Sequence, residues 1–362
     1  MKKRLIVLGG GAHTIPSYRA MLKLIAGEYD LILLSEFHLD KKLQVEEYII
    51  RSVPAGKRRW RELLFFLMVV KTCFAERPHI IHSHSTYPSG VVAVIAGWLF
   101  RIPVVVCLDA AEGSGVPEIN FGDLLNARRA KLNRWVLNKA AAVTTLTRFQ
   151  CEEVCNHLHF KNTIHVVPRG VDSVHYLSGE REQVKAPIRF LSVAYLHPVK
   201  DHTTMLHAFQ LISQHVEASL TLVGEDYENG NIKALARELG IEQKIMFAGF
   251  VPHDRILDYY HQSDIFLHTS LFESQAMAVV EAMASGVLVC GTHVGIMADL
   301  SGECCITVSV RDYQLLAHNV LELIRTPSEQ ERLRTNALKW VNMHSLQWTT
   351  DQYFGLYKGL IG

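Results

Sequence analysis

The chain has 362 residues, of which 49% are hydrophobic and 20% are charged, and its net charge is +1. This composition excludes an intrinsically disordered chain and lacks the strong positive charge that is typical of nucleic-acid-binding proteins. The length suits two domains of about 170 residues each better than a single core.

The small net charge conceals an asymmetry between the two halves of the chain. Residues 1–175 carry 23 Lys and Arg against 15 Asp and Glu, and the remaining residues carry 14 against 21. A basic first half suggests an anionic partner, such as a membrane surface or a polyanionic acceptor. Electrostatic matching between two domains would explain the asymmetry equally well.

The seven cysteines do not form a metal-binding pattern. Cys151 and Cys155 are one helical turn apart, and Cys304 and Cys305 are adjacent, and neither is a zinc-ligand spacing. Several cysteines fall in apolar, strand-like runs. We therefore expect reduced thiols in the core of a cytosolic protein, without a metal site.

The amino terminus predicts a buried strand followed by a glycine-rich turn. The apolar run Leu5–Leu8 is too short for a signal peptide, and it leads into three glycines, 9–11, and then a helix over 18–26. Glycines at such a turn allow a ligand to approach the backbone, so Gly10 and Gly11 are candidate loop residues. Their spacing matches no dinucleotide or phosphate-loop motif, and a purely structural turn remains an equal alternative.

Residues 57–77 predict a helix with basic residues around Trp60 and an apolar body. Two interpretations stay open: the helix packs on one face of a sheet, or it docks on an anionic membrane surface. The longest apolar runs, 63–70 and 91–100, are far shorter than the roughly 20 residues that a transmembrane helix needs. No membrane-spanning segment is expected.

The rest of the first half alternates strands with helices. The predicted elements are strands over 79–84, 104–108 and 142–147 and helices over 91–100, 127–139 and 149–158, with 164–172 closing the first domain. After a polar linker over 173–187, the second half repeats the alternation, with strands over 189–193, 219–223 and 245–247 and helices over 203–215, 232–239 and 255–261.

The most informative stretch is 264–300. It predicts a strand over 265–268, a polar turn, a small-residue helix over 275–285 that Gly286 ends, and another strand over 287–290. This is one unit of a parallel α/β sheet, and the start of its helix lies at the carboxyl edge of the strand, where such sheets bind ligands.

Two acids mark this unit, Glu273 in the turn and Glu281 in the helix. Eight helical positions correspond to roughly 12 Å, more than the about 5 to 9.5 Å that separates the carboxylates of glycosidases. Acids this far apart suit opposite ends of an extended ligand, and the backbone N–H groups between them favour phosphate. The layout fits a nucleotide-sugar. The alternative is a Glu273 that complements the helix dipole and a solvated Glu281.

The spacing Glu, seven residues, Glu, with "EAMASG" and a following strand, resembles the donor site of the retaining GT-B glycosyltransferases of glycosyltransferase family 4. The resemblance covers most of the chain, including a His-x-His strand end, a Pro-and-Gly turn, a helix and a "PVV" strand over 82–106. It implies two Rossmann-like α/β domains, 1–173 and 174–343, that face a cleft, with a C-terminal helix over 344–362 that returns to the first domain.

The resemblance also implies roles for single residues. Glu273 would contact the transferred sugar, Glu281 the ribose, and Lys200 the diphosphate. The remaining donor-binding and loop candidates are Ser274, Gln275, Ala276 and Met277 at the phosphates, Val251 near the base, and Gly10 and Gly11 facing the diphosphate and acceptor.

The chain departs from the family pattern at four places. Asp109 replaces a His that touches the donor sugar; as a candidate catalytic residue it would accept a sugar hydroxyl. Tyr195 replaces a diphosphate-binding Arg, a loss for which Arg169 or His197 could compensate. Arg169 stands where Asn is common and would reach a phosphate, or else cap a turn on the surface. Residues 274–276 replace Gly-Phe-Gly and stiffen the loop.

The implied activity is metal-independent, retaining transfer of a hexose-like sugar from a nucleoside-diphosphate sugar to a glycan or lipid-linked acceptor, without a cofactor, in cell-surface polysaccharide or glycolipid biosynthesis. The absence of an Asp-x-Asp motif argues against a metal-dependent GT-A enzyme. A cytoplasmic protein, peripheral at the inner face of the membrane, is expected. The alternatives are a non-catalytic GT-B scaffold, suggested by Asp109 and Tyr195, and a sugar-nucleotide epimerase.

Overall fold

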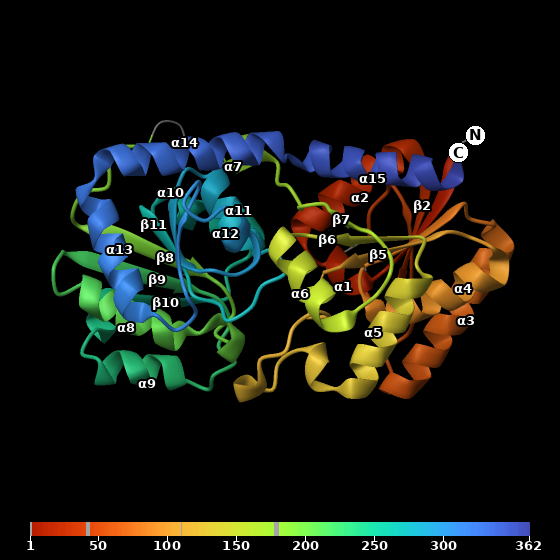
Figure 1. Ribbon diagram of the computed structural model, residues 1–362, viewed down its shortest axis with the longest axis horizontal. Helices are drawn as coiled ribbons and strands as arrows, with labels where there is room; N and C mark the ends of the chain where they lie inside the picture. The colour runs from red at the N-terminus through yellow and green to blue at the C-terminus, as the bar shows by residue number, and fades with distance from the viewer. Residues whose placement is uncertain (1, 41–43, 110, 177–180) are drawn as a thin grey trace. The chain divides into compact units, whose positions relative to one another are not determined.

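The computed structural model describes residues 2–40, 44–109, 111–176 and 181–362. The chain divides into two compact units (Figure 1). The N-terminal unit comprises Met1–Gly170 together with Leu346–Gly362, and the C-terminal unit comprises Val171–Ser345. Among the described residues, no helix is both long and apolar enough to cross a bilayer.

The N-terminal unit is built on a seven-stranded parallel sheet with the strand order β3-β2-β1-β4-β5-β6-β7. Its strands are β1 (Lys3–Leu8), β2 (Tyr29–Ser35), β3 (Ile49–Ser52), β4 (Ile80–Ser83), β5 (Val104–Leu108), β6 (Ala142–Thr145) and β7 (Ile164–Val166). The order reverses between β1 and β4. In a doubly wound sheet, this is the point where the carboxyl ends of the strands leave a crevice for ligands.

Helices cover both faces of this sheet. One face packs against α3 (Arg58–Glu76), α4 (Val91–Phe100), α5 (Ala127–Lys139) and α6 (Arg148–Leu158), and the other packs against α2 (Pro16–Glu28) and α15 (Leu346–Ile361). A short helix, α1 (Gly10–His13), precedes α2. The helix α15 lies beside α2 (Figure 1) and buries Tyr353 and Tyr357. The predicted return of the C-terminal helix to the first domain is therefore confirmed.

The C-terminal unit repeats the arrangement with six parallel strands in the order β10-β9-β8-β11-β12-β13. Its strands are β8 (Ile188–Val193), β9 (Ala218–Val223), β10 (Ile245–Gly249), β11 (Ile265–His268), β12 (Leu288–Thr292) and β13 (Ile306–Val308). Here the order reverses between β8 and β11. The predicted α/β class with two Rossmann-like parallel sheets is confirmed.

The helices of this unit also form two layers. One face packs against α8 (His202–Ile212), α9 (Asn231–Glu238) and α13 (Tyr313–Arg325), and the other against α7 (Ser173–Tyr176), α10 (His253–His261), α11 (Met277–Ala284), α12 (Gly295–Asp299) and α14 (Pro327–Met343). The strands carry near-continuous apolar runs because both of their faces are covered.

Some predicted elements need correction. The linker predicted over 173–187 begins with α7, whose Tyr176 is buried in the core. The strand β3 and the helix α1 were not predicted, because β3 (IIRS) is an edge strand without a buried apolar run and α1 (GGAH) contains two of the glycines that indicated a turn. All seven cysteines are free and five are buried, but Cys155 is exposed, so the expectation of core thiols fails there.

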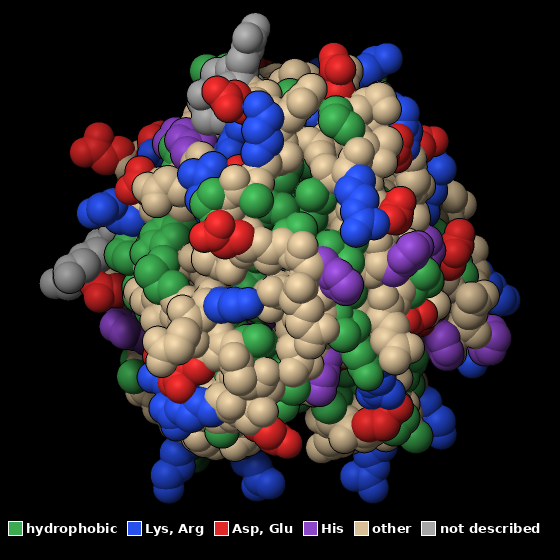
Figure 2. All heavy atoms as spheres, turned by 90° about the vertical axis from the view of Figure 1, so that its left-hand side faces the viewer, with side chains coloured by type: hydrophobic (Ala, Val, Ile, Leu, Met, Phe, Trp, Pro, Cys, Tyr) green, Lys and Arg blue, Asp and Glu red, His purple; other side chains and the backbone are tan. Residues whose placement is uncertain are grey.

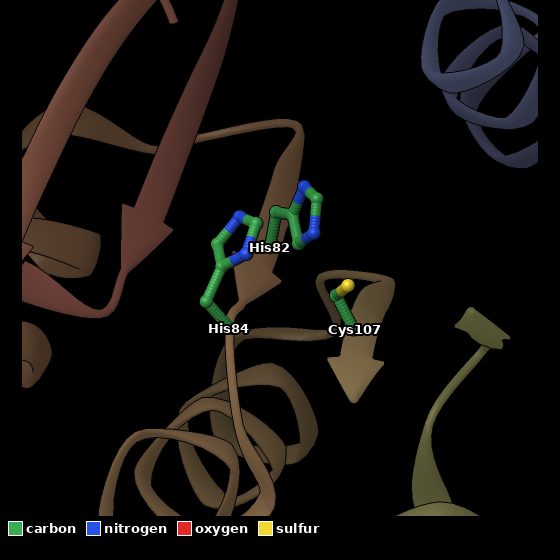
Figure 3. A group of neighbouring side chains, drawn as sticks. All are labelled: His82, His84 and Cys107. Atoms are coloured by element: carbon green, nitrogen blue, oxygen red, sulfur yellow. The ribbon is translucent and has the colours of Figure 1, made fainter. Parts of the chain in front are cut away.

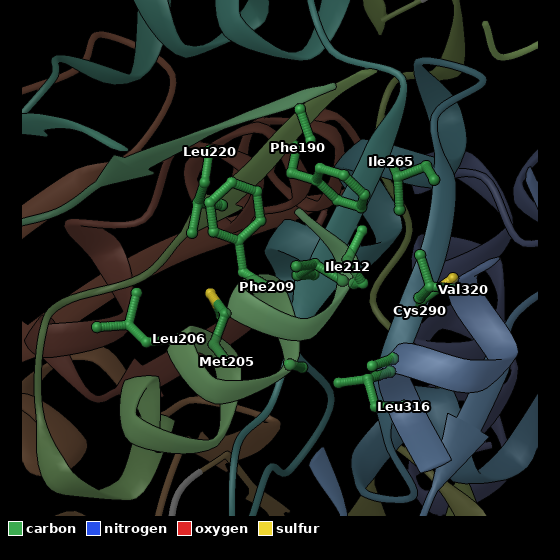
Figure 4. Close-up of a cluster of buried hydrophobic side chains, with 14 of the residues drawn as sticks. Phe190, Met205, Leu206, Phe209, Ile212, Leu220, Ile265, Cys290, Leu316 and Val320 are labelled. Atoms are coloured by element: carbon green, nitrogen blue, oxygen red, sulfur yellow. The ribbon is translucent and has the colours of Figure 1, made fainter. Parts of the chain in front are cut away.

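The core of the C-terminal unit depends on Phe209 of α8, which lies among buried aliphatic side chains and edge-on to Phe190 at a centroid distance of 5.8 Å (Figure 4). We expect Phe209→Ala to destabilise this unit by about 3–5 kcal/mol through lost burial and a residual cavity. Urea unfolding measures the change. The exposed Phe250 provides the control: Phe250→Ala should change stability by less than about 0.5 kcal/mol, and equal losses in both variants would contradict this packing.

Candidate active site

Two loops of the C-terminal unit bring a lysine and a glutamate together. Lys200 ends the short turn Pro198–Lys200, which follows β8, and Glu273 lies in the loop after β11. The Nζ atom of Lys200 lies 2.5 Å from Oε1 of Glu273. Because β8 and β11 are adjacent where the strand order reverses, their loops meet at the edge where such sheets bind ligands. Lys200 is therefore held in an ion pair, which excludes the alternative that it is only a solvated loop lysine.

The carboxylate of Glu273 has further partners. The hydroxyl of Ser270 donates to Oε1 at 2.7 Å, and Nε2 of His268 lies 3.1 Å from the same oxygen without the alignment of a hydrogen bond. Burial opposes ionisation of Glu273, but the charge of Lys200 and the contact with His268 outweigh it and hold its pKa below the ordinary value. The site is a fixed ion pair in which Lys200 retains donors that Glu273 does not use.

Glu281 lies inside α11 and is buried among polar side chains. The hydroxyl of Tyr260 donates to Oε2 at 3.0 Å, and Nε2 of His253 lies 3.2 Å from Oε1. The hydroxyl of Tyr176 lies 3.3 Å from the same histidine nitrogen. Burial and then the charge of Glu281 raise the pKa of Tyr260 well above its usual value, so that this phenol remains a donor. The alternative of a solvated Glu281 is wrong.

The loop between the two acids is held against α12. Gly295 has φ +54°, and a Cβ atom there would lie 2.8 Å from Cβ of Glu273. The N–H of Ile296 donates to the carbonyl of Gln275 at 3.0 Å. Ala276 has φ +76°, a left-handed conformation that costs a non-glycine residue on the order of 1 kcal/mol. The loop therefore keeps one constrained geometry although it lacks the glycines of the resembled family.

The first turn of α11 offers backbone donors beside this loop. Ala276 occupies the N-cap position without a side-chain cap, and within the described part of the chain the N–H groups of Met277 and Ala278 have no partner. Unpaired N–H groups and the positive end of the helix dipole favour an anion. Ser274 and Gln275 precede these groups in the same turn. The predicted phosphate-contacting residues thus surround one helix N-terminus.

The other predicted donor residues of this unit occupy the rim of the same sheet edge. Tyr195 follows β8, is 52% exposed and meets the edge of Tyr227 at a centroid distance of 5.5 Å. Val251 follows β10 and packs, half-buried, against the core around α11. Nδ1 of His197 accepts from the N–H of Val199 at 3.2 Å, so this histidine caps its own turn. Tyr195 presents a hydroxyl in place of a guanidinium.

Asp109 and Arg169 form a closed pair in the N-terminal unit. Nη2 of Arg169 donates to both oxygens of Asp109 at 2.8 and 2.7 Å, Nδ1 of His84 lies 2.9 Å from Oδ2, and the thiol of Cys107 donates to Oδ1 at 3.3 Å. Arg169 is only 5% exposed, so its interpretation as a surface residue is wrong. A carboxylate accepts about four hydrogen bonds, and these contacts leave Asp109 no capacity for the sugar hydroxyl that the sequence suggested.

Electrostatics keeps this pair charged. Burial disfavours ionisation of Asp109, but the guanidinium of Arg169 and the hydrogen bond with His84 hold its pKa well below the ordinary value. Burial lowers the pKa of His84 below its usual value, so the ring is neutral near pH 7 and its Nδ1–H donates to Asp109. The charges of Asp109 and Arg169 therefore compensate each other inside the unit.

His82, His84 and Cys107 each place one possible metal ligand atom within 4.8 Å of the others (Figure 3). These side chains have other partners. Nδ1 of His82 lies 2.5 Å from the hydroxyl of Tyr357, and the hydroxyl of Tyr353 donates to the thiol of Cys107. Burial raises the pKa of Cys107, whereas a metal ion needs the thiolate. We interpret the cluster as a polar network that attaches α15 to the sheet.

The glycine-rich turn lies beside a cavity of about 410 Å³ in the N-terminal unit. A Cβ atom at Gly10 would collide with the side chain of Ser35, and the N–H of Gly10 donates to Oε2 of Glu36 at 3.0 Å, whereas Gly11 is exposed. Burial raises the pKa of Glu36, which lines the cavity. Its other charged lining residues are Arg58, Arg61, Glu62, Glu112, Asp123 and Arg129. A cavity lined by both signs of charge suits a polar, hydroxyl-rich ligand.

Sequence reasoning missed several of these side chains. His268 carries a weak signal, because it is a polar residue at the end of an otherwise apolar strand. Tyr260 and His253, which hold Glu281, lie in a helix that gave no functional signal, since their role depends on α10 packing beside α11. The partnership of Asp109 with Arg169 joins residues 60 positions apart and could not be read from local patterns.

Two Rossmann-like units are the building blocks of the GT-B class of fold. Residues 18–174 match the family model described as Glycosyltransferase Family 4, and residues 179–340 match the model described as Glycosyl transferases group 1. Together the two matches reach into both units. The chain belongs to the family 4 group of GT-B glycosyltransferases, as its motifs indicated.

Curated relatives are distant. N-acetyl-alpha-D-glucosaminyl L-malate synthase of Bacillus anthracis is 25% identical over 69% of this chain and 66% of that protein. The 2-deoxystreptamine glucosyltransferase of Streptomyces kanamyceticus is 26% identical over 48% of each chain. The aligned stretches thus span from about half to just under two thirds of these two relatives.

Solved structures agree in fold over nearly the whole chain. The HepE protein of Anabaena, in complex with UDP and glucose, superposes with a TM-score of 0.79 at 17% identity and covers 98% of this chain and 99% of that one. Sucrose-phosphate synthase of Thermosynechococcus elongatus gives a TM-score of 0.80 at 16% identity, with 99% of each chain covered. At these identities the likeness establishes the fold.

The closed pair of Asp109 and Arg169 predicts a large effect of removing one partner. We expect Asp109→Asn to destabilise the N-terminal unit by about 3–5 kcal/mol, because Arg169 is left as a buried, uncompensated charge. The double variant Asp109→Leu/Arg169→Met should recover most of the loss. Urea unfolding of the two variants measures this. A loss below about 1 kcal/mol in the single variant would contradict a fully buried pair.

The same pair predicts a pH dependence. The pKa of Asp109 in the folded protein is lower than in the unfolded chain, so its contribution to stability is present above the unfolded value of about 3.9 and is lost as the pH falls through the lower, folded value. The acid limb of the stability profile should therefore be shallower in Asp109→Asn than in the wild type.

Proposed function

We propose that the protein is a retaining glycosyltransferase that moves a hexose-like sugar from a nucleoside-diphosphate sugar to an acceptor hydroxyl. The observation that carries this proposal is the partly buried ion pair of Lys200 and Glu273 beside the open N-terminus of α11. A lysine and unpaired N–H groups form a site for an anion, and an adjacent carboxylate accepts hydrogen bonds from hydroxyl groups. A diphosphate that carries a sugar presents both chemistries.

We assign the following roles, which the family resemblance implies and this geometry supports. Lys200 and the N–H groups of Met277 and Ala278 bind the diphosphate, and Glu273 orients the sugar through its hydroxyls. Glu281, whose carboxylate is held by a hydrogen bond from Tyr260, accepts hydrogen bonds from the ribose hydroxyls at the other end of the loop. The fixed positions of these groups lower the cost of arranging a flexible donor for reaction.

In the proposed reaction, the bond between the anomeric carbon and the diphosphate oxygen breaks, and its electron pair stays on that oxygen. The acceptor oxygen forms the new bond on the same face of the sugar, and its proton passes to the departing phosphate. Negative charge therefore grows on the diphosphate. Lys200 and the dipole of α11 stabilise this charge without a metal ion.

The cavity of the N-terminal unit supplies the acceptor side of the proposal. Its mixed lining, with Arg129 over the ring of Tyr87 at 3.8 Å, suits a polyhydroxylated glycan. We assign Asp109 and Arg169 a positioning role, because they form an ion pair with each other and Asp109 also accepts a hydrogen bond from His84. We propose biosynthesis of cell-surface polysaccharide or glycolipid as the setting, which is what the family resemblance implies. UDP is the first nucleotide to test, because HepE was solved with UDP.

A non-catalytic GT-B scaffold is the second candidate. The exposed Tyr195, at a position where the family has a cation, and the saturated Asp109 favour it. Calorimetry with UDP and GDP separates the two, since a scaffold without donor chemistry binds neither. An epimerase on the same architecture would release an altered free sugar without an acceptor, which product analysis detects.

Kinetics of three variants tests the assignment. Lys200→Ala should lower kcat by about a hundredfold to a thousandfold, because charge on the leaving group loses its stabilising cation. Lys200→Arg should restore part of the loss. Glu281→Gln should weaken nucleotide binding by about tenfold, since a charge-assisted hydrogen bond to ribose becomes a neutral one.

The control is Lys185→Ala, because Lys185 is an exposed lysine of the same unit. It should leave both constants unchanged, and thermal unfolding of every variant shows whether the fold is intact. Unaltered kinetics in both Lys200→Ala and Glu281→Gln would remove the donor-site assignment.

A further inference from the structure

The helix α3 is apolar on two opposite sides. Its inner side packs on the sheet through Phe65, Val69 and Cys73, which are buried. Its outer side carries five large apolar residues that are between 41% and 74% exposed, namely Trp60, Leu63, Leu64, Leu67 and Phe74. The first four follow the helical spacing i, i+3, i+4, i+7 and so form one continuous strip. We call these five residues the outer strip.

The outer strip is bordered by uncompensated positive charge. Lys57, Arg59 and Lys71 are exposed, and within the described residues none of them forms an ion pair. The two acids of α3 are already neutralised: Glu62 pairs with Arg58, and Glu76 pairs with arginines outside the helix. The exposed charge of α3 is therefore positive.

The neighbouring helices on the same face of the sheet extend this character. Helix α4 contains no charged residue and exposes Trp98 and Leu99, and α5 carries five Lys and Arg, no acid, and a partly exposed Trp135. Three of the five tryptophans of the chain thus lie exposed on α3, α4 and α5. By contrast, acidic and basic side chains are interspersed on the face drawn in Figure 2.

We propose that the outer strip of α3 docks on an anionic lipid bilayer, with the helix lying in the plane of the surface. Leucine and phenylalanine side chains enter the boundary between headgroups and acyl chains, tryptophan sits at headgroup level, and the bordering lysines and arginines bind anionic headgroups. Charge complementarity selects this partner, since a strip rimmed by one sign of charge fits a surface of the opposite sign.

Docking has a consequence for the cavity of the N-terminal unit. Arg58, Arg61 and Glu62, in the first turns of α3, line that cavity, so a bilayer on the outer strip would lie close to it. A lipid-linked acceptor could then enter the cavity without leaving the membrane surface. This consequence rests on the proposed function, whereas the binding of α3 to lipid does not.

Flotation with vesicles tests the docking without any enzyme assay. The wild-type chain should bind vesicles of phosphatidylcholine mixed with an equal amount of phosphatidylglycerol at least about tenfold more strongly than vesicles of phosphatidylcholine alone, since each basic residue near an anionic surface contributes about 1 kcal/mol, or about fivefold. Leu67→Ser and Arg59→Glu should each reduce binding by at least about fivefold, and added salt should weaken it.

The matched controls are Met246→Ser and Lys185→Glu in the C-terminal unit. Met246 and Leu67 are both 52% exposed, and Lys185, like Arg59, is an exposed cation. Neither control should alter vesicle binding, and thermal unfolding verifies the fold of each variant. Equal binding to both vesicle types, or no binding to either, would overturn the proposal. Self-association that Leu67→Ser abolishes, without vesicle binding, would overturn it in favour of a second copy of the chain.

Discussion

The partly buried ion pair between Lys200 and Glu273 is the constraint around which the C-terminal unit is organised. An ion pair seldom stabilises a protein more than apolar residues of the same shape would, because both ions lose part of their hydration. We therefore propose that this pair is important for function rather than for stability. The reversal of strand order between β8 and β11 brings the two loops together, and Gly295 lets α12 close on the loop that carries Glu273. The fold thereby fixes a cation and a carboxylate beside an open helix N-terminus.

In the N-terminal unit, by contrast, the buried charges of Asp109 and Arg169 are paired with each other. Arg169, His84 and Cys107 fill the four hydrogen-bond acceptor positions of Asp109, so this carboxylate has none left for a ligand. We propose that the ligand-binding side chains of this unit are instead those of the cavity near Gly10, which is lined by acids and arginines. The proposed division of labour follows: one unit supplies an open anion site for the donor, and the other supplies a polar cavity and a basic, apolar surface for the acceptor and its membrane.

Much of the secondary structure was predictable from the sequence, because the spacing of apolar residues indicates which residues of a helix or strand are buried. The helix over 91–100 has the same bounds in the structure, and the unit over 264–300 follows the predicted order of strand, turn, helix and strand. The family resemblance placed Lys200 and Glu273 at the same donor, but their ion pair, which joins residues 73 positions apart, was not predicted. The hydrogen-bond partners of Asp109 were not predictable. From the sequence, its carboxylate was expected to accept a hydrogen bond from a sugar, and only the structure shows that Arg169 occupies both of its oxygens. The exposed outer strip of α3 was not predictable either, because the sequence of an apolar helix does not show which of its sides packs on the sheet.

The central claim is that Lys200 recognises a diphosphate, and calorimetry with a matched pair of nucleotides tests it most directly. UDP and UMP differ by one phosphate, so the difference in their affinities isolates the contact with that group; GDP and GMP serve if the uridine nucleotides do not bind. The account predicts that the wild type binds the diphosphate at least about tenfold more tightly than the monophosphate, and that Lys200→Met removes most of this preference without lowering the melting temperature. Equal affinities in the wild type, or an undiminished preference in Lys200→Met, would contradict it.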